Sequence, residues 1–205
     1  MSLFKNIIFD FGGVIIKVDY HRLVNAFIKL GVKDFDKLYS QANQGKLFDD
    51  FEKGLLSADE FRKRLKSISN VPLTDEQIDD AWNAILINLP AENIELLRQL
   101  KTHYRLFLLS NTNEIHEKAF TEMMVHDFGK NVLPDVFEGI YFSHRVHKRK
   151  PDAEIFEQVL KENNLSASET LFIDDSPQHI EGAKQLGFQT LLLEKGKTIS
   201  DIFFV

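Results

Sequence analysis

The stretch that decides the fold is Asn6-Ile7-Ile8-Phe9-Asp10-Phe11-Gly12-Gly13-Val14, an apolar run that carries one carboxylate and a pair of glycines. Apolar residues at nearly every position from Asn6 to Ile16 are typical of a strand buried on both faces of a parallel sheet. Because ligands bind beyond the carboxyl ends of such strands, the pattern places Asp10 where chemistry can occur. The glycines let a ligand approach the backbone closely.

Four further runs have the same nearly continuous apolar pattern, and segments with helical periodicity lie between them. The predicted strands are 104–109, 139–142, 170–173 and 189–193, of which 139–142 has the weakest pattern. The predicted helices are 91–101, 114–126, 152–163 and 176–187. Strands that alternate with helices of this length indicate parallel βαβ units. The sequence therefore predicts an α/β fold, a three-layer Rossmann-like sandwich around a parallel sheet.

The segment from Lys17 to Leu89 has a different pattern, because its apolar residues recur at helical spacing and no strand-like run in it is comparably strong. Thr74, followed three residues later by Gln77, matches a capping box. We interpret the segment as an all-helical cap inserted after the first strand. The predicted domains are a catalytic core of residues 1–16 and 90–205 and a cap of residues 17–89. The alternative is that these helices only flank the sheet.

Composition narrows the class of protein. The chain has 205 residues, 25 Lys+Arg against 31 Asp+Glu, and a net charge of −6, which argues against a sequence-independent nucleic-acid binder. The absence of cysteine excludes disulfides, thiolate catalysis and cysteine metal sites. No stretch approaches the ~18 apolar residues of a membrane span. We therefore expect a cytoplasmic protein that binds neither nucleic acid nor membrane.

Polar side chains follow the other predicted strands as well. Ser110-Asn111-Thr112-Asn113 comes directly after one strand, Lys150-Pro151 follows the weak strand, and Asp174-Asp175 ends the strand 170–173. Each motif alone is explained by helix capping or by a loop that enters a helix. Together they place carboxylates, a hydroxyl, amides and a lysine at one edge of one sheet. This convergence indicates a site.

The carboxylates suit phosphoryl transfer. Asp10 at a strand tip is a predicted nucleophile that attacks phosphorus. Because Asp10 and a substrate phosphate repel each other, a bridging Mg²⁺ would lower that barrier, and Asp174 and Asp175 supply the oxygen ligands that Mg²⁺ prefers. We expect Asp175 to be the direct ligand and Asp174 to act through a water molecule or by contacting a residue that binds the metal.

The remaining polar groups suit phosphate binding. Ser110 and the backbone amide of Asn111 are predicted to hold phosphoryl oxygens, and Gly13 allows the phosphate to approach the backbone. Lys150 is predicted to neutralise charge on Asp10 and on the phosphate. The predicted catalytic residues are therefore Asp10, Ser110 and Lys150.

With these residues in place, the sequence resembles the haloacid-dehalogenase superfamily of phosphohydrolases that use an aspartate nucleophile. The four motifs of that superfamily occur in order at 9–14, 109–112, 150–151 and 172–175, and the resemblance extends to about Gly187. Within the superfamily, the sequence is most similar to the glucose-1-phosphatase-like branch, near the N-terminal phosphatase domain of epoxide hydrolases. Two features carry this similarity: His116, which follows the Ser-Asn-Thr-Asn stretch, and the segment Glu181-Gly182-Ala183. The resemblance implies a C1-type cap, an aspartyl-phosphate on Asp10 and Mg²⁺ as cofactor.

Gly12 departs from the superfamily pattern, in which a second aspartate usually occupies this position as general acid/base. That aspartate touches the metal through its backbone carbonyl, which Gly12 retains, so the resemblance implies that Gly12 remains a metal ligand. The proton donor for the leaving group is lost, and such help is worth ~10²–10⁴-fold. The same departure is familiar in the similar branch, so slower turnover or a donor from elsewhere is expected, not an inactive protein.

Several residues have two interpretations. His116 either lines the pocket or lies on the surface, and Asp19, Tyr20 and Arg22 follow the first hinge, from which cap residues could reach the pocket. The run with His144 and His147 either contacts an anionic substrate or is a solvated loop. A last group is expected in the core of the cap: Trp82, Phe48, Phe51 and Phe61.

The function that best fits these residues is a Mg²⁺-dependent phosphohydrolase that acts on a small phosphorylated metabolite. Without a resident acid at Gly12, leaving groups of low pKa are favoured, so a sugar-1-phosphate is the expected substrate. One alternative is a haloacid dehalogenase, which attacks carbon and needs no metal. Others are a non-catalytic phosphometabolite-binding protein and a phosphomutase, although Gly12 counts against the last. The sequence leaves the oligomeric state open.

Overall fold

The computed structural model describes residues 4–39 and 45–203 and contains one five-stranded parallel sheet in the order β5-β4-β1-β6-β7. Its strands are β1 (Asn6–Phe9), β4 (Arg105–Ser110), β5 (Gly139–Phe142), β6 (Thr170–Asp174) and β7 (Gln189–Leu192). The central strand β1 pairs in parallel with β4 on one side and β6 on the other. All five predicted strands are present, and the predicted fold class is confirmed.

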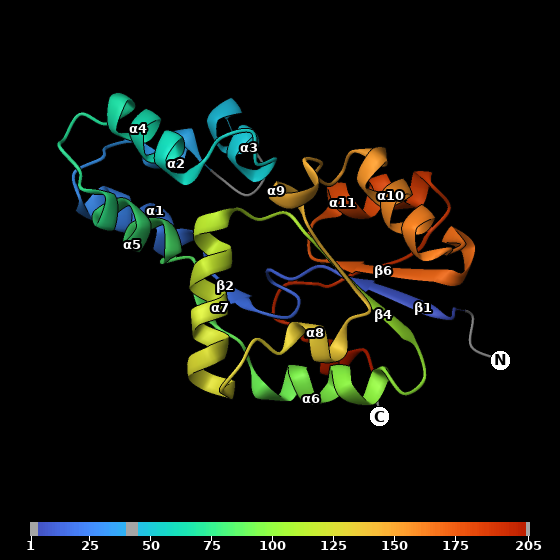
Figure 1. The fold of residues 1–205 in the computed structure, drawn as a ribbon. Coiled ribbons are helices and arrows are strands. Elements are labelled where there is room, and N and C mark those ends of the chain that lie inside the picture. The colour runs from blue at the N-terminus through green and yellow to red at the C-terminus, as the bar shows by residue number, and fades with distance from the viewer. Residues whose placement is uncertain (1–3, 40–44, 204–205) are drawn as a thin grey trace.

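Helices cover both faces of the sheet, as Figure 1 shows. On one face, Ile7 and Phe9 share an apolar cluster with α6 (Ala91–Leu100), α7 (Glu114–Phe128) and α8 (Leu133–Val136). On the other face, Ile8 shares a cluster with α10 (Ala153–Asn163) and α11 (Pro177–Gln185). Successive side chains of a strand point to opposite faces, so a strand with helices on both sides must be apolar at every position. This burial explains the unbroken apolar run of the sequence.

The first strand is shorter than the sequence pattern predicts, because it ends at Phe9 and not at Ile16. The amides of Ile15 and Ile16 both donate hydrogen bonds to the carbonyl of Phe11, and Gly13 has a φ of 78°. The chain therefore turns back on itself directly after the strand. The apolar residues of this turn remain buried in the core, which explains why the apolar pattern continues beyond the strand.

Residues 20–39 and 45–83 form a helical unit that lies beside the sheet in Figure 1. Its helices are α1 (Tyr20–Lys29), α2 (Phe35–Leu38), α3 (Lys46–Glu52), α4 (Ala58–Ile68) and α5 (Asp75–Asn83). They enclose an apolar cluster of their own, in which Trp82 and the three phenylalanines lie as predicted. The capping box of Thr74 and Gln77 at the start of α5 is also present. The domain limits 1–16, 17–89 and 90–205 stay a prediction.

The two ends of the inserted segment pair with each other as short antiparallel strands, β2 (Lys17–Val18) and β3 (Leu86–Asn88). Strands this short contain too few residues to show an alternation of apolar and polar positions, so the sequence pattern does not reveal them. The remaining short elements are α9 (Ser143–Val146) and two 3₁₀ turns, η1 (Ala167–Glu169) and η2 (Ile199–Asp201). Over the described ranges, no helix is both long and apolar enough to span a membrane.

Candidate active site

Three of the predicted site residues meet at the carboxyl edge of the sheet because they end three adjacent strands. Asp10 directly follows β1, Ser110 is the last residue of β4, and Asp174 is the last residue of β6. The amide of Asp10 donates to the carbonyl of Ile173 at 2.8 Å, which extends the pairing of β1 with β6 to the nucleophile position. All three polar side chains are buried.

Lys150 links two of these carboxylates. Its ammonium nitrogen Nζ lies 2.7 Å from Oδ1 of Asp10 and 2.7 Å from Oδ2 of Asp174, and its side chain is fully buried. Burial alone would lower the pKa of Lys150, but the two carboxylates outweigh burial and raise it. The residue is therefore a fixed cation between two strand ends.

The two carboxylates have opposite electrostatic environments. Burial raises the pKa of Asp10 to about 6, although Lys150 opposes the shift. For Asp174, burial is outweighed by Lys150 and by the hydrogen bond from His179, and the pKa falls to about 2. Asp174 accepts hydrogen bonds from Lys150 Nζ, from the amide of Ser176 and from His179 Nδ1. Asp174 is thus an anchored anion.

The loop that carries Lys150 is clamped to the end of β4. The side chain of Asn111 accepts a hydrogen bond from the Lys150 amide and donates one to the Lys150 carbonyl, both at 2.9 Å. The hydroxyl of Ser143 makes a similar pair of bonds with the main chain of Thr112. The sequence predicts a role for the Asn111 backbone only, so its side-chain clamp and Ser143 were missed.

The carboxylates of Asp10, Asp174 and Asp175 form a group that fits a hard cation. One ligand atom from each lies within 4.8 Å of the other two. Gly13 makes room for Asp175, because a Cβ at Gly13 would stand 2.4 Å from Asp175 Oδ2 and φ there is positive. Oxygen donors of this kind are the ones that Mg²⁺ prefers, so these residues can hold it.

Gly12 leaves open space where the superfamily carries a second aspartate. A Cβ at Gly12 would meet only Val18, at an ordinary contact distance of 3.7 Å. The position would therefore accommodate a side chain. Steric crowding therefore does not explain why this position has a glycine and no acidic side chain.

The helical unit completes two hollows of about 60 Å³ each beside the strand ends. Both are lined by Gly12, Asn111, Tyr20 and Glu52, and one of them also by Asp10. A larger hollow of about 370 Å³ is lined by Gly13, Tyr20, Asp175 and the segment 193–197, but not by Asp10. Of the three residues after the first hinge, Tyr20 lines all three hollows, Asp19 caps α1 and lines only the largest, and Arg22 is exposed.

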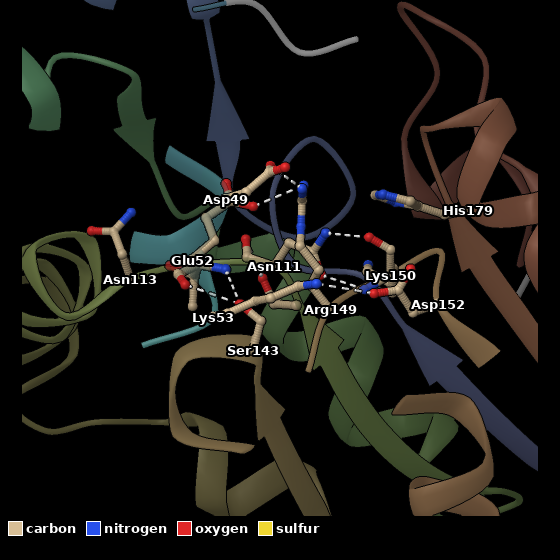
Figure 2. Close-up of polar contacts among 12 residues, drawn as sticks. Asp49, Glu52, Lys53, Asn111, Asn113, Ser143, Arg149, Lys150, Asp152 and His179 are labelled. Carbon is tan, nitrogen blue, oxygen red and sulfur yellow. Dashed lines mark hydrogen bonds and ion pairs between the residues drawn. The ribbon is translucent and has the colours of Figure 1, made fainter. Parts of the chain in front are cut away.

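The basic run before Lys150 contacts the helical unit through Arg149 (Figure 2), although Arg145 and His147 are exposed. Arg149 forms ion pairs with Asp49 and with Glu52, the latter at 2.9 Å. His147 donates to the Lys53 carbonyl at 2.9 Å, and Lys53 Nζ lies 3.2 Å from Asp152. A last contact joins His144 to Glu117 on α7. The run is therefore only partly exposed to solvent, its contact with a substrate stays a prediction, and α3 is docked on the segment that carries Lys150.

His116 is buried in the first turn of α7, and it joins that helix to α5. Its ring stacks on Trp82 at 5.1 Å, its Nε2 donates to the Trp82 carbonyl, and its Nδ1 accepts from Asn113. Burial lowers its pKa to about 4. His116 lines one of the two small hollows, as one interpretation predicted, but Asp10 does not line that hollow.

Comparison with known proteins gives the family. The model of the haloacid dehalogenase-like hydrolases matches residues 4–187. The chain belongs to this family. The D-ribitol-5-phosphate phosphatase of Bacteroides thetaiotaomicron is 38% identical over 95% of this chain and 94% of its own. The sesquiterpene phosphatase of Aspergillus oryzae is 28% identical over 94% of this chain and 91% of its own.

A solved structure shows the same architecture. It is a haloacid dehalogenase family enzyme of Bacteroides thetaiotaomicron, an alanine mutant in complex with magnesium and inorganic phosphate. Its TM-score to this chain is 0.92 at 33% sequence identity, and the match covers 98% of this chain and all of that one. These findings confirm three predictions made from the sequence: the family, the enzyme class of phosphoric monoester hydrolase, and Mg²⁺ as cofactor. The roles assigned to individual residues stay predictions.

Proposed function

We propose that the protein hydrolyses the phosphate monoester of a small hydroxylated metabolite, with Asp10 as nucleophile and Mg²⁺ as a required cofactor. One observation carries the proposal: Asp10 is buried at a strand tip, paired with Lys150 at 2.7 Å and grouped with two further carboxylates. A carboxylate that only stabilised the fold would need its cation but not a second and third anion beside it.

The residues suit a two-step displacement. In the first step an oxygen of Asp10 attacks phosphorus, the bond from phosphorus to the leaving oxygen breaks, and the alkoxide takes a proton to become an alcohol. In the second step water attacks the phosphorus of the aspartyl-phosphate, the bond to Asp10 breaks, and inorganic phosphate leaves. Lys150 offsets the negative charge around Asp10 in both steps, and Ser110 orients a phosphoryl oxygen.

Asp10, Asp175 and the Gly12 carbonyl are the residues that would hold Mg²⁺, with Asp174 behind them. Asp174 is fully buried and accepts hydrogen bonds from Lys150, Ser176 and His179, whereas Asp175 is only partly buried and lines the hollow that contains Asp10. This difference supports Asp175 as the direct ligand. When bound, the ion supplies positive charge that reduces repulsion between the nucleophile and the substrate phosphate.

The substrate class rests on the relative that acts on D-ribitol 5-phosphate, which matches nearly the whole chain. We extend this to phosphates of sugars and sugar alcohols. Our sequence-based prediction of a sugar-1-phosphate is the finer form, because the anomeric oxygen leaves readily without an acid at Gly12. Cytoplasmic location likewise stays a prediction.

The dehalogenase alternative is disfavoured by the carboxylate group, since a metal-independent attack on carbon gains nothing from Asp174 and Asp175 beside the nucleophile. The test is phosphate release from a panel of sugar, polyol and aryl phosphates, with Mg²⁺ and after chelation. Release that requires Mg²⁺ supports the proposal. Halide release from 2-haloacids without phosphate release would overturn it.

A further inference from the structure

The helical unit brings a charged pair into the hollow beside Asp10, and the chemistry proposed above does not use it. Glu52, at the end of α3, is only 7% exposed and lines both small hollows together with Tyr20. Arg149 lines the hollow that contains Asp10 and pairs with Glu52 at 2.9 Å. Both members of this ion pair therefore face the space beside the nucleophile, where the leaving group of a substrate would lie.

We propose that Glu52, Tyr20 and Arg149 form the subsite for the leaving group, and that this subsite selects phosphate esters of polyhydroxylated chains. The inference rests on the proposed function, because it concerns the part of the substrate that Asp10 expels. It assigns these residues to specificity and not to bond making.

The chemistry of Glu52 determines which part of a substrate fits there. An ionised carboxylate repels a phosphate dianion, so the phosphate belongs at Lys150 and Ser110 and the rest of the substrate faces Glu52. Carboxylate oxygens only accept hydrogen bonds, so the matching group is a donor. Arg149 beside Glu52 disfavours a cationic amine, which leaves a hydroxyl.

Tyr20 and Arg149 add complementary groups. Burial, followed by the nearby carboxylates of Glu52, Asp175 and Asp10, raises the pKa of Tyr20, so its hydroxyl stays protonated at neutral pH and can donate. The Nε of Arg149 is buried and has no hydrogen-bond partner among the described residues. A chain with several hydroxyls can therefore meet acceptor and donor groups on adjacent carbons.

The size of the hollows agrees with a short chain. Each has a volume of about 60 Å³. A long hydrocarbon chain, such as a sesquiterpene, would also leave Glu52 and Arg149 desolvated without new partners.

A purely structural role for Glu52 makes a different prediction. Asp49 lies on the same helix and pairs with the same Arg149, but it lines neither small hollow. If Glu52 only anchors α3 to Arg149, the substitutions Asp49→Asn and Glu52→Gln should change substrate preference alike. Asp49→Asn is therefore the matched control.

The experiment measures kcat/KM for D-ribitol 5-phosphate, n-pentyl phosphate and p-nitrophenyl phosphate with Mg²⁺. The first two have the same chain length and differ in their hydroxyls. We expect the wild type to prefer ribitol 5-phosphate over pentyl phosphate by at least ~100-fold, because an unfilled polar site rejects the analogue. Glu52→Gln should reduce this preference roughly tenfold, the size of a hydrogen bond to a charged group, and Asp49→Asn should preserve it.

Each outcome decides the proposal. A wild type that prefers pentyl phosphate, or that cleaves only p-nitrophenyl phosphate, overturns the subsite but leaves the phosphatase intact. Equal changes in preference for the two variants, or a loss of kcat on all three esters with unchanged preference, also overturn it. No release from any ester would instead refute the proposed function itself. If Glu52→Gln does not fold, the wild-type preference and Tyr20→Phe provide the same test.

Discussion

Removing the cation of the site should damage both the fold and the reaction. In Lys150→Ala, two buried carboxylates, those of Asp10 and Asp174, lose the ammonium that lies 2.7 Å from each. Breaking a buried ion pair by removing one partner costs about 3–5 kcal/mol, because the remaining charge is left uncompensated. For a chain of this size, 1 kcal/mol corresponds to about 2–4 °C in Tm. The expected decrease in Tm is therefore about 6–20 °C.

The assay is thermal unfolding without metal, followed by kcat/KM for p-nitrophenyl phosphate at a temperature where the variant is folded. Lys53→Ala is the matched control, because Lys53 also pairs with an aspartate, at 3.2 Å, but both side chains are partly exposed. A pair of that kind contributes about 0–1 kcal/mol. A decrease in Tm below 2 °C for Lys150→Ala, or one equal to that of Lys53→Ala, would refute the reasoning.

Further predictions concern the same group of residues. Asp10→Asn should abolish turnover and keep the fold, because the amide is nearly isosteric but a poor nucleophile; activity within tenfold of the wild type contradicts the assignment. Ser110→Ala should reduce kcat/KM less than Lys150→Ala, and equal, mild losses would show that both roles are misplaced. EDTA should remove activity and Mg²⁺ restore it, and full activity after chelation would contradict Mg²⁺ as a required cofactor. Because Gly12 supplies no proton, log kcat/KM should depend steeply on leaving-group pKa; a flat plot with chemistry rate-limiting contradicts this. Because the pKa of His116 is lowered to about 4 in the folded state, the unfolded state binds more protons at this residue than the folded state does between pH 6.5 and 4. Stability should therefore fall by about 2 kcal/mol from pH 7 to pH 5 through this residue, and urea unfolding of His116→Gln should show a correspondingly smaller decrease; an equal decrease contradicts the burial argument.

The meeting of the strand-end residues, to which we assign phosphate binding, could be predicted from the sequence because local pattern decides it. Asp10, Ser110 and Asp174 follow apolar runs directly, and parallel strands bring their carboxyl ends to one edge. Knowing where the strands end is therefore enough to bring the side chains together. The overlong first strand shows the limit of this reasoning, because the core also buries the turn that follows Phe9.

The part of the site that faces the leaving group could not be predicted, because tertiary docking decides it. Glu52 ends a short helix that also contains Asp49 and Asp50, and nothing in that run distinguishes the carboxylate that faces the hollow. Arg149 belongs to a basic run whose partners lie about a hundred positions away in the chain. Their meeting depends on how α3 sits on the core, where Gly54 approaches the His144 carbonyl too closely for any Cβ.

Two adjacent residues connect these two parts of the site. Lys150 faces the carboxylates at the strand ends and is held through its main chain by Asn111, which belongs to the core. Arg149 faces α3 of the helical unit. The cation that we assign to the phosphate is therefore held by hydrogen bonds from the core, whereas the groups that we propose for the leaving group come together only where the helical unit meets the core. Under our proposal, substitutions in α3 should change the preferred alcohol more than the contacts of Lys150, and two relatives of this chain are named as phosphatases of a sugar alcohol phosphate and of a sesquiterpene.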